Sequence, residues 1–285
     1  MIEIKKALLQ ASNELIPQES ARLEAEILLA HVLMKTRSYL YTHPDALLST
    51  EQWQAFKDLV KQRVNGLPIA YLTGTREFWS LPLKVCKDTL IPRPETELLV
   101  ELTLDLLADN PQAQILELGT GSGAIALACA FERPAWQITA IDCSAAALKI
   151  AEENATRLGL TNINFCLSDW FASLATKKLF DAIITNPPYI AANDPHLLIG
   201  DLRFEPSLAL VSGDDGLTAI QHIIQHSLER LKPGGLLLLE HGFDQKSVIR
   251  SMLNNYGYSQ LQCWQDGQYK DRVSGGKRIK GLVDT

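Results

Sequence analysis

In the second half of this chain, short apolar runs alternate with stretches of helical spacing. The apolar runs are strand candidates, at Ile115–Leu118, Ile138–Ile141, Ile163–Leu167, Phe180–Thr185 and Leu236–Glu240. Between several of them lie segments of helical spacing, at Ala124–Phe131, Ala145–Leu158 and Thr218–Leu231. Strands that alternate with helices predict a parallel sheet covered on both faces. We therefore predict an α/β fold with a doubly wound, mostly parallel sheet.

The two ends of the chain add different elements. Tyr258–Trp264 and Arg272–Ile279 are strand candidates with no helix recognised between them, and they predict an antiparallel C-terminal hairpin. Apolar residues near the N-terminus recur at helical spacing, and a further helix is predicted over Glu51–Val64 after the cap candidates Ser49 and Thr50. We predict a small all-α N-terminal domain at 1–75, a hairpin or linker at 76–98 and the α/β domain at 99–285. Pro94 is placed to begin a helix that runs to about Asn110.

Composition narrows the classes of function. The 285 residues hold 27 Lys and Arg against 33 Asp and Glu, a net charge of -6. Proteins that grip duplex nucleic acid usually have a basic surface, so direct sequence-specific nucleic-acid binding is not expected. The five cysteines contain no CxxC pair and fall largely in apolar runs, as buried cysteines of a reducing compartment do. With no signal peptide and no membrane-length apolar run, we expect a cytoplasmic protein that has no membrane association.

A glycine-rich turn follows the first predicted strand and opens a helix. Glycines at Gly119, Gly121 and Gly123 permit positive φ angles and let a ligand approach the backbone closely. Asp142 ends the next strand, where a carboxylate can accept hydrogen bonds from the hydroxyls of a ribose. The same spacing also satisfies a dinucleotide-binding pattern. The loop therefore predicts a nucleotide-like cofactor and leaves open which one.

The segment Asn186-Pro187-Pro188-Tyr189 follows the strand Phe180–Thr185, at the sheet edge where ligands bind. Neither proline has an N–H to donate, so backbone carbonyls can point into the site. The Asn186 side-chain oxygen and the Pro187 carbonyl can accept the two hydrogens of a planar NH2 group, while Tyr189 stacks on it. Two oxygen acceptors stabilise the positive charge that grows on nitrogen during methyl transfer. This segment favours a methyltransferase acting on an amide or amine nitrogen.

Taken together, these motifs resemble the bacterial release-factor glutamine methyltransferases of the class I S-adenosylmethionine-dependent family, which have a Rossmann-like fold. The resemblance covers nearly the whole chain. The segments that carry it are IPRPETE (Ile91–Glu97), ELGTGSGAIAL (Glu117–Leu127), Asp142, SDWF (Ser168–Phe171), NPPYI (Asn186–Ile190), RFEPSLAL (Arg203–Leu210), LLLEHG (Leu237–Gly242) and RVSGGKR (Arg272–Arg278).

The resemblance implies methylation of the glutamine side-chain amide in the Gly-Gly-Gln loop of class I peptide chain release factors, with S-adenosyl-L-methionine as cofactor. It implies that Gly119, Thr120, Gly121, Ser122 and Gly123 hold the cofactor with Asp142 and Asn186, and that Trp170 lines its adenine side. Asn186, Pro187, Pro188 and Tyr189 would grip the glutamine. The helical domain would help to dock the release factor.

Three other interpretations compete with this one. A DNA or RNA amino-methyltransferase would use the same Asn-Pro-Pro-Tyr chemistry, but the acidic balance disfavours it. A Rossmann dehydrogenase leaves that segment unexplained, and a non-enzymatic docking module accounts for the helical domain alone. His222 and His226 share a helix face at metal-ligand spacing without a third ligand, so no metal is predicted. His241, beside Glu240, is interpreted as a buried, hydrogen-bonded histidine.

Overall fold

The computed structural model describes residues 1–16, 20–174 and 178–279. The chain divides into two compact units, Met1–Thr75 with His196–Phe204, and Arg76–Pro195 with Glu205–Thr285. We call them the helical unit and the α/β unit. The predicted domains 1–75 and 99–285 include residues 17–19, 175–177 and 280–285, which lie outside the described residues. Among the described residues, no helix has the length and apolar character needed to cross a membrane.

The helical unit packs its helices around one apolar core. Its helices are α1 (Ile4–Glu14), α2 (Ala21–Leu33), α3 (Arg37–Thr42), α4 (Thr50–Val64) and α5 (Ile69–Thr73). The predicted cap of α4 is confirmed, because Ser49 and Gln52 exchange side-chain and backbone hydrogen bonds in a capping box. Helices α3 and α5 were not predicted, since six and five residues are too few to display a helical period.

A buried arginine joins the segment His196–Phe204 to the rest of the helical unit. Arg63 Nε donates to Glu24 Oε2 at 2.8 Å, and Arg63 Nη1 donates to Asp201 Oδ1 at 2.9 Å. Leu198 and Ile199 of the same segment are among the exposed large apolar side chains. A segment that follows the Asn-Pro-Pro-Tyr motif in sequence therefore belongs to the helical unit in space.

The α/β unit begins with the predicted hairpin, formed by β1 (Thr75–Phe78) and β2 (Leu81–Lys84). Its two turn residues, Trp79 and Ser80, both have positive φ, which tight two-residue hairpins favour. The helix predicted at Pro94 starts as a 3-10 turn, η1 (Pro94–Thr96), and continues as α6 (Glu97–Leu106). It therefore ends before the predicted Asn110.

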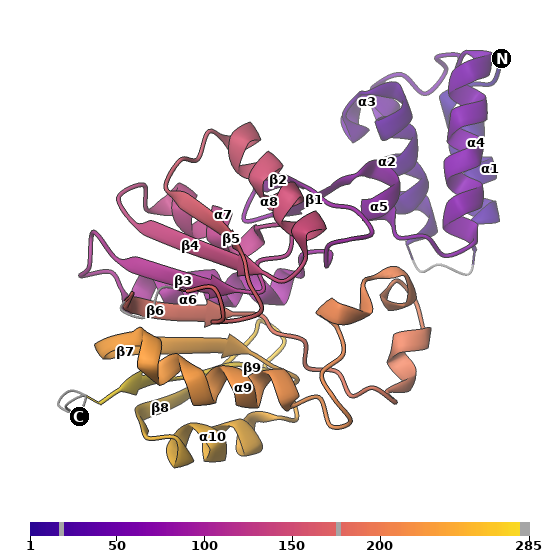
Figure 1. Ribbon diagram of the computed structural model, residues 1–285. Coiled ribbons are helices and arrows are strands. Elements are labelled where there is room, and N and C mark those ends of the chain that lie inside the picture. Colours follow the sequence, from indigo (N-terminus) through magenta and orange to yellow (C-terminus); the bar gives the residue numbers. More distant parts are fainter. Residues whose placement is uncertain (17–19, 175–177, 280–285) are drawn as a thin grey trace. The chain divides into compact units, whose positions relative to one another are not determined.

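The main sheet has seven strands in the order β5-β4-β3-β6-β7-β9-β8 (Figure 1). Their bounds are β3 (Gln114–Leu118), β4 (Gln137–Asp142), β5 (Ile163–Leu167), β6 (Phe180–Thr185), β7 (Leu231–Glu240), β8 (Tyr258–Gln265) and β9 (Asp271–Arg278). Strands β5, β4, β3, β6 and β7 pair in parallel, whereas β9 pairs antiparallel with both β7 and β8. The predicted doubly wound, mostly parallel sheet with a C-terminal antiparallel hairpin is confirmed.

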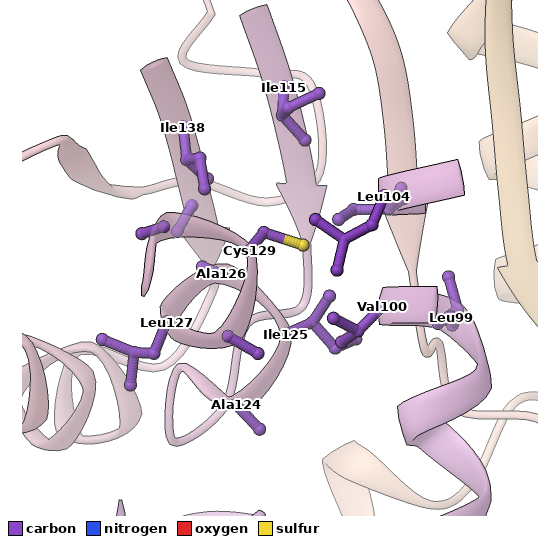
Figure 2. Packing of buried hydrophobic residues seen from close by; sticks show 14 of the residues in the cluster. Leu99, Val100, Leu104, Ile115, Ala124, Ile125, Ala126, Leu127, Cys129 and Ile138 are labelled. Carbon is purple, nitrogen blue, oxygen red and sulfur yellow. The ribbon is translucent and has the colours of Figure 1, made fainter. Parts of the chain in front are cut away.

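Helices cover both faces of this sheet, which is why its central strands read as continuous apolar runs. The helices are α6, α7 (Ala124–Glu132), α8 (Ala145–Leu158), α9 (Thr218–Ser227) and α10 (Lys246–Asn255). Ile115 of β3 packs in the cluster that contains α6 and α7, whereas its neighbour Leu116 packs with α9 and α10. In Figure 2, Ile125 and Cys129 of α7 turn toward Val100 and Leu104 of α6.

Two predicted boundaries near the C-terminus were wrong. Strand β7 begins at Leu231 rather than Leu236, and α9 ends at Ser227, followed by the 3-10 turn η5 (Leu228–Arg230). The Pro-Gly-Gly at 233–235 has the composition of a turn, but in the structure it lies within β7. The pairing of β7 with β6 is irregular at this point, because the register shifts between Phe180 and Ala182 of β6. Helix α10 was also missed, because little of its surface is apolar and only Ile249 and Leu253 are buried.

Candidate active site

A cavity of about 490 Å³ lies in the α/β unit at the carboxyl ends of four parallel strands. Gly119 follows β3, Asp142 ends β4, Ser168 follows β5 and Asn186 follows β6, and all four line the cavity. The chain runs from β3 through β4 to β5 on one side, and then returns across β3 to β6 on the other. Such a reversal of strand order opens the crevice in which α/β sheets bind ligands. The volume suits one small-molecule ligand.

In the glycine-rich loop, Gly119 and Gly121 line the cavity with backbone atoms alone. Gly119 and Gly121 have φ of +70° and +58°, and a Cβ added to either would meet nothing within 4 Å. Gly123 differs, because a Cβ there would lie 2.8 Å from Leu127 and 3.2 Å from Ala151. The first two glycines thus leave room for a ligand, and the third permits close helix packing.

Two other residues of this loop, Thr120 and Ser122, are buried in the protein interior. The Thr120 hydroxyl donates to Glu117 Oε2 at 2.6 Å, and the Ala126 N–H donates to the same oxygen at 3.1 Å. Ser122 is buried, and its carbonyl accepts from Asn154 Nδ2 at 3.0 Å. Burial raises the pKa of Glu117 to about 7. These bonds fix the shape of the loop around the two open glycines.

Asp142 is held in place by backbone donors. Its Oδ2 accepts the Gly121 N–H at 2.8 Å, and its Oδ1 accepts the Ser144 N–H at 2.8 Å. Burial raises the pKa of Asp142, and the N–H groups of Ser144 and Gly121 act against that rise. Each carboxylate oxygen keeps a second acceptor site. The arrangement therefore suits the two hydroxyls of a ribose.

Trp170 lies in the cavity wall with strained backbone. Its φ is +45°, which is uncommon for a bulky residue. The Ser168 hydroxyl donates to the Trp170 carbonyl at 3.0 Å and accepts the Ser173 N–H at 2.9 Å, so the turn is tied from both sides. The strain presents an aromatic side chain to the cavity, where a planar ring of a ligand can stack.

Asn186 has a defined amide orientation. Its Nδ2 donates to the Thr96 hydroxyl at 3.1 Å, and Thr96 is buried in the turn before α6. Among the described residues, none donates a hydrogen bond to Asn186 Oδ1. The side-chain oxygen of Asn186 is therefore available as an acceptor at the cavity wall.

Tyr189 is fixed at both its hydroxyl and its carbonyl. The hydroxyl donates to Glu240 Oε1 at 3.3 Å, and the carbonyl accepts from Gln245 Nε2 at 3.1 Å. Burial and the adjacent Glu240 carboxyl raise the pKa of the Tyr189 hydroxyl, which keeps it protonated. Glu240 ends β7 and is 1% exposed.

The predicted site residues divide between the cavity wall and positions outside it. Gly119, Gly121, Asp142, Trp170, Asn186 and Pro188 line the cavity. Thr120, Ser122, Gly123, Pro187 and Tyr189 lie outside the lining.

His241 is buried with hydrogen bonds at both ring nitrogens, as predicted. His222 and His226 do share one face of α9, with ring centroids 4.5 Å apart, and His222 lines the cavity. The described residues contain no group of three or more side chains suited to hold a metal.

Sequence reasoning missed several wall residues. Asp88, Thr89 and Leu90 of the predicted linker line the cavity, as do Leu208 and Ala209 of the RFEPSLAL segment. Cysteines were interpreted as buried, but Cys143 is exposed and lines the cavity, and of the five only Cys129 is buried. In the sequence, only its position directly after Asp142 could have indicated that Cys143 lies at the cavity.

Two motifs of the wall are tied together by a buried acid. Glu205 Oε2 accepts the Ile91 N–H at 2.9 Å, and Glu205 Oε1 pairs with the Arg93 guanidinium. The Glu205 side chain has no exposed surface. This pair joins the linker segment IPRPETE to the RFEPSLAL segment, so that Leu90 and Pro206 meet the same cavity.

Both parts of the chain match known protein families. Residues 6–74 match the family described as PrmC N-terminal domain, and residues 109–277 match the family described as methyltransferase domain. The release factor glutamine methyltransferase of Vibrio cholerae is 48% identical over 275 residues, covering 95% of this chain and 96% of that protein. The protein of the same name from Escherichia coli K12 is 46% identical, covering 97% of this chain and 99% of that protein.

Solved structures support the fold. The catalytic domain of hMettl16, in complex with an RNA hairpin, superimposes with a TM-score of 0.59 at 16% identity, covering 79% of this chain and 84% of that one. The 16S rRNA methyltransferase RsmC of T. thermophilus, in complex with AdoMet and guanosine, gives a TM-score of 0.51 at 19% identity, with 72% and 49% covered. Identities this low show the shared fold alone. The relatives that span nearly the whole chain show more: this protein belongs to the release factor glutamine methyltransferase family.

Proposed function

We propose that this enzyme transfers a methyl group from S-adenosyl-L-methionine to the side-chain amide nitrogen of the glutamine in the Gly-Gly-Gln motif of class I peptide chain release factors. The names of its relatives give the substrate class. The observation that carries the chemistry is the orientation of Asn186. Its Nδ2 donates to Thr96, and its Oδ1 accepts no hydrogen bond from the residues that the structure describes.

The cavity has the features that this cofactor needs. Asp142 would accept the ribose hydroxyls, and the open space over Gly119 and Gly121 would receive the cofactor close to the backbone. Trp170 would lie along the adenine. When bound, S-adenosylmethionine supplies a methyl group on a sulfonium, which is a good electrophile because sulfur leaves as a neutral thioether.

The protein's contribution to transfer is positioning. An amide nitrogen is a poor nucleophile because its lone pair is delocalised into the carbonyl. Asn186 Oδ1 and the Pro187 carbonyl would accept its two N–H groups and hold the nitrogen toward the methyl group. The N–C bond forms as the S–C bond breaks, and the nitrogen then releases one proton to solvent. The two oxygen acceptors stabilise the positive charge that grows on nitrogen before the proton leaves.

We assign release-factor docking to the helical domain at 1–75, with methyl transfer in 99–285 and the linker 76–98 between them. Exposed Leu198 and Ile199, in the segment that packs with the helical unit, support this assignment. Replacing both with serine is expected to raise the KM for the release factor without changing cofactor affinity. We place the protein in the bacterial cytoplasm, and its net charge of -6 argues against direct sequence-specific nucleic-acid binding.

A parallel assay tests the proposal. Purified enzyme and labelled S-adenosylmethionine are offered a folded release factor, duplex DNA and total RNA in separate reactions. We expect label in the release factor and none in nucleic acid. Label in DNA or RNA, with none in the release factor, would retain amino-methyl transfer and contradict the assigned substrate.

A further inference from the structure

A buried asparagine on α8 bonds both to the hairpin strand β2 and to the glycine-rich loop. Helix α8 packs against β2 (Figure 1). Asn154 of α8 is 1% exposed. Its Oδ1 accepts the Lys84 N–H at 2.7 Å, and its Nδ2 donates to the Lys84 carbonyl at 3.0 Å. The same Nδ2 donates to the Ser122 carbonyl at 3.0 Å. One side-chain amide thus bonds three backbone groups of two separate segments.

Each of the two segments continues into the wall of the cavity. Ser122 directly follows Gly121, whose backbone lines the cavity. Lys84 ends β2, and the chain then passes to residues 88–90, which line another part of the wall. Asn154 itself is not a lining residue. It therefore relates two parts of the wall to each other from outside the cavity.

The polarity of these contacts requires an amide at position 154. Two carbonyl oxygens face Nδ2 and one N–H faces Oδ1, so each contact joins a donor to an acceptor. An aspartate of the same shape would place an oxygen against the carbonyls of Lys84 and Ser122, which repel it. An apolar side chain would make none of the three bonds. Buried backbone groups that lose a partner are costly, so either change favours a different arrangement of the two segments.

We propose that Asn154 is a positioning residue for S-adenosylmethionine, which holds the glycine-rich loop and residues 88–90 in the shape that receives the cofactor. The inference rests on the placement of the cofactor in this cavity, which is part of the proposed function. Gly119 and Gly121 have positive φ, and glycine backbone has little steric preference of its own. The loop therefore depends on its hydrogen bonds for its shape. Without the Asn154 amide, it would also adopt shapes that do not bind the cofactor.

Two substitutions of Asn154 test the inference. Asn154→Asp keeps the shape of the side chain and reverses the polarity at Nδ2. Asn154→Ser is milder, because its short hydroxyl cannot reach both segments but leaves space for water to solvate the freed carbonyls. If about a tenth of the molecules keep the binding shape, the affinity for S-adenosylmethionine falls about 10-fold. Isothermal titration calorimetry measures this affinity without any release factor, so the result does not depend on the assigned substrate.

Kinetics distinguish a positioning role from a general structural one. The KM for S-adenosylmethionine should rise by the same factor of about 10 in both Asn154 variants. At saturating cofactor, kcat for release-factor methylation should stay near its wild-type value, because the bound cofactor selects the competent shape of the loop.

Asn162 provides a matched control. Its Nδ2 donates to the carbonyls of Arg133 and Trp136 at 3.3 and 3.2 Å, and it precedes β5, at the opposite end of the sheet from the cavity. Asn162→Asp makes the same chemical change against backbone carbonyls, so it should lower thermal stability and leave cofactor affinity unchanged. Glu153→Gln removes the neighbouring ion pair of α8 with Lys84 Nζ, at 2.6 Å, and should also leave cofactor affinity unchanged.

Three results would overturn the inference. Wild-type cofactor affinity in both Asn154 variants would remove it and leave the proposed function intact. Equal losses of affinity in Asn154→Asp and Asn162→Asp, in proportion to their losses of stability, would make Asn154 a structural residue. Normal cofactor affinity in Gly119→Ala would refute the placement of the cofactor in this cavity, and this inference with it.

Discussion

The backbone N–H of Gly121 donates to Asp142 Oδ2 across 2.8 Å and so joins the loop after β3 to the end of β4. One carboxylate thereby holds the open glycine loop and also presents its remaining lone pairs to the cavity. Cofactor affinity should consequently depend on the charge of Asp142 as well as on its shape.

Replacing Asp142 with asparagine keeps the shape and removes the charge. Hydrogen bonds to charged groups are about twice as strong as neutral ones, so we expect S-adenosylmethionine affinity to fall about 10- to 100-fold. Isothermal titration calorimetry measures the effect. Unchanged affinity would show that Asp142 serves the loop and not the ligand.

Gly119→Ala should prevent cofactor binding. Its effect on the stability of the fold should be no larger than that of a glycine-to-alanine substitution far from the cavity. Gly119 and Gly159 have φ of +70° and +69°, and a Cβ on either would meet nothing within 4 Å. Both alanine variants should lose about 1 kcal/mol of stability from backbone strain. Only Gly119 lines the cavity, so only Gly119→Ala should lose cofactor affinity. Equal affinity in the two variants would refute this placement of the ligand.

Asn186→Ala should separate binding from chemistry. The variant loses the Oδ1 acceptor but leaves Gly119, Gly121 and Asp142 in place, so cofactor affinity should change little. Methyl transfer should fall by about 100-fold or more, the typical effect of removing one transition-state hydrogen-bonding group. Titration calorimetry and a methylation assay on the same preparation measure both quantities. Equal losses of binding and turnover would contradict the role assigned to Asn186.

Glu240 predicts a pH dependence of stability. Burial raises the pKa of its carboxyl from 4.5 to about 7, so the folded state favours the protonated form. This contribution to stability is complete below pH 4.5 and is lost as the pH rises toward 7. The unfolding free energy of the wild type relative to Glu240→Gln should therefore fall by about 3 kcal/mol between those limits. Urea denaturation at pH 5 and pH 8 measures it, and a difference that does not change with pH would argue against a raised pKa.

The sequence predicted the centre of the sheet well because its central strands are buried on both faces. The largely apolar run of β6 predicts such a strand directly, and its predicted bounds match the structure. The bounds of β5 were also predicted correctly, although β5 lies at the edge of the sheet and none of its residues is buried. Strand β7 was predicted too short because the Pro-Gly-Gly at 233–235 has the composition of a turn. The pairing of Leu231 with Phe180 of β6 cannot be recognised from the sequence.

Residues of the candidate site could be predicted from the sequence only where a motif directly follows a predicted strand. Asp142 and Asn186 line the cavity because the carboxyl ends of parallel strands meet at one edge. Thr96 and Glu240 could not be related to them from sequence, since they approach Asn186 and Tyr189 through contacts that span 90 and 51 residues. No local spacing encodes such contacts.

The position of the transferred methyl group tests the proposed substrate and reaction together. A folded release factor treated with S-adenosylmethionine and this enzyme is digested, and its peptides are sequenced by mass spectrometry. We predict a single added methyl on the side-chain nitrogen of the Gly-Gly-Gln glutamine, absent when Asn186→Ala enzyme is used. A methyl on any other residue, or none while the same preparation labels nucleic acid, would refute the proposed function.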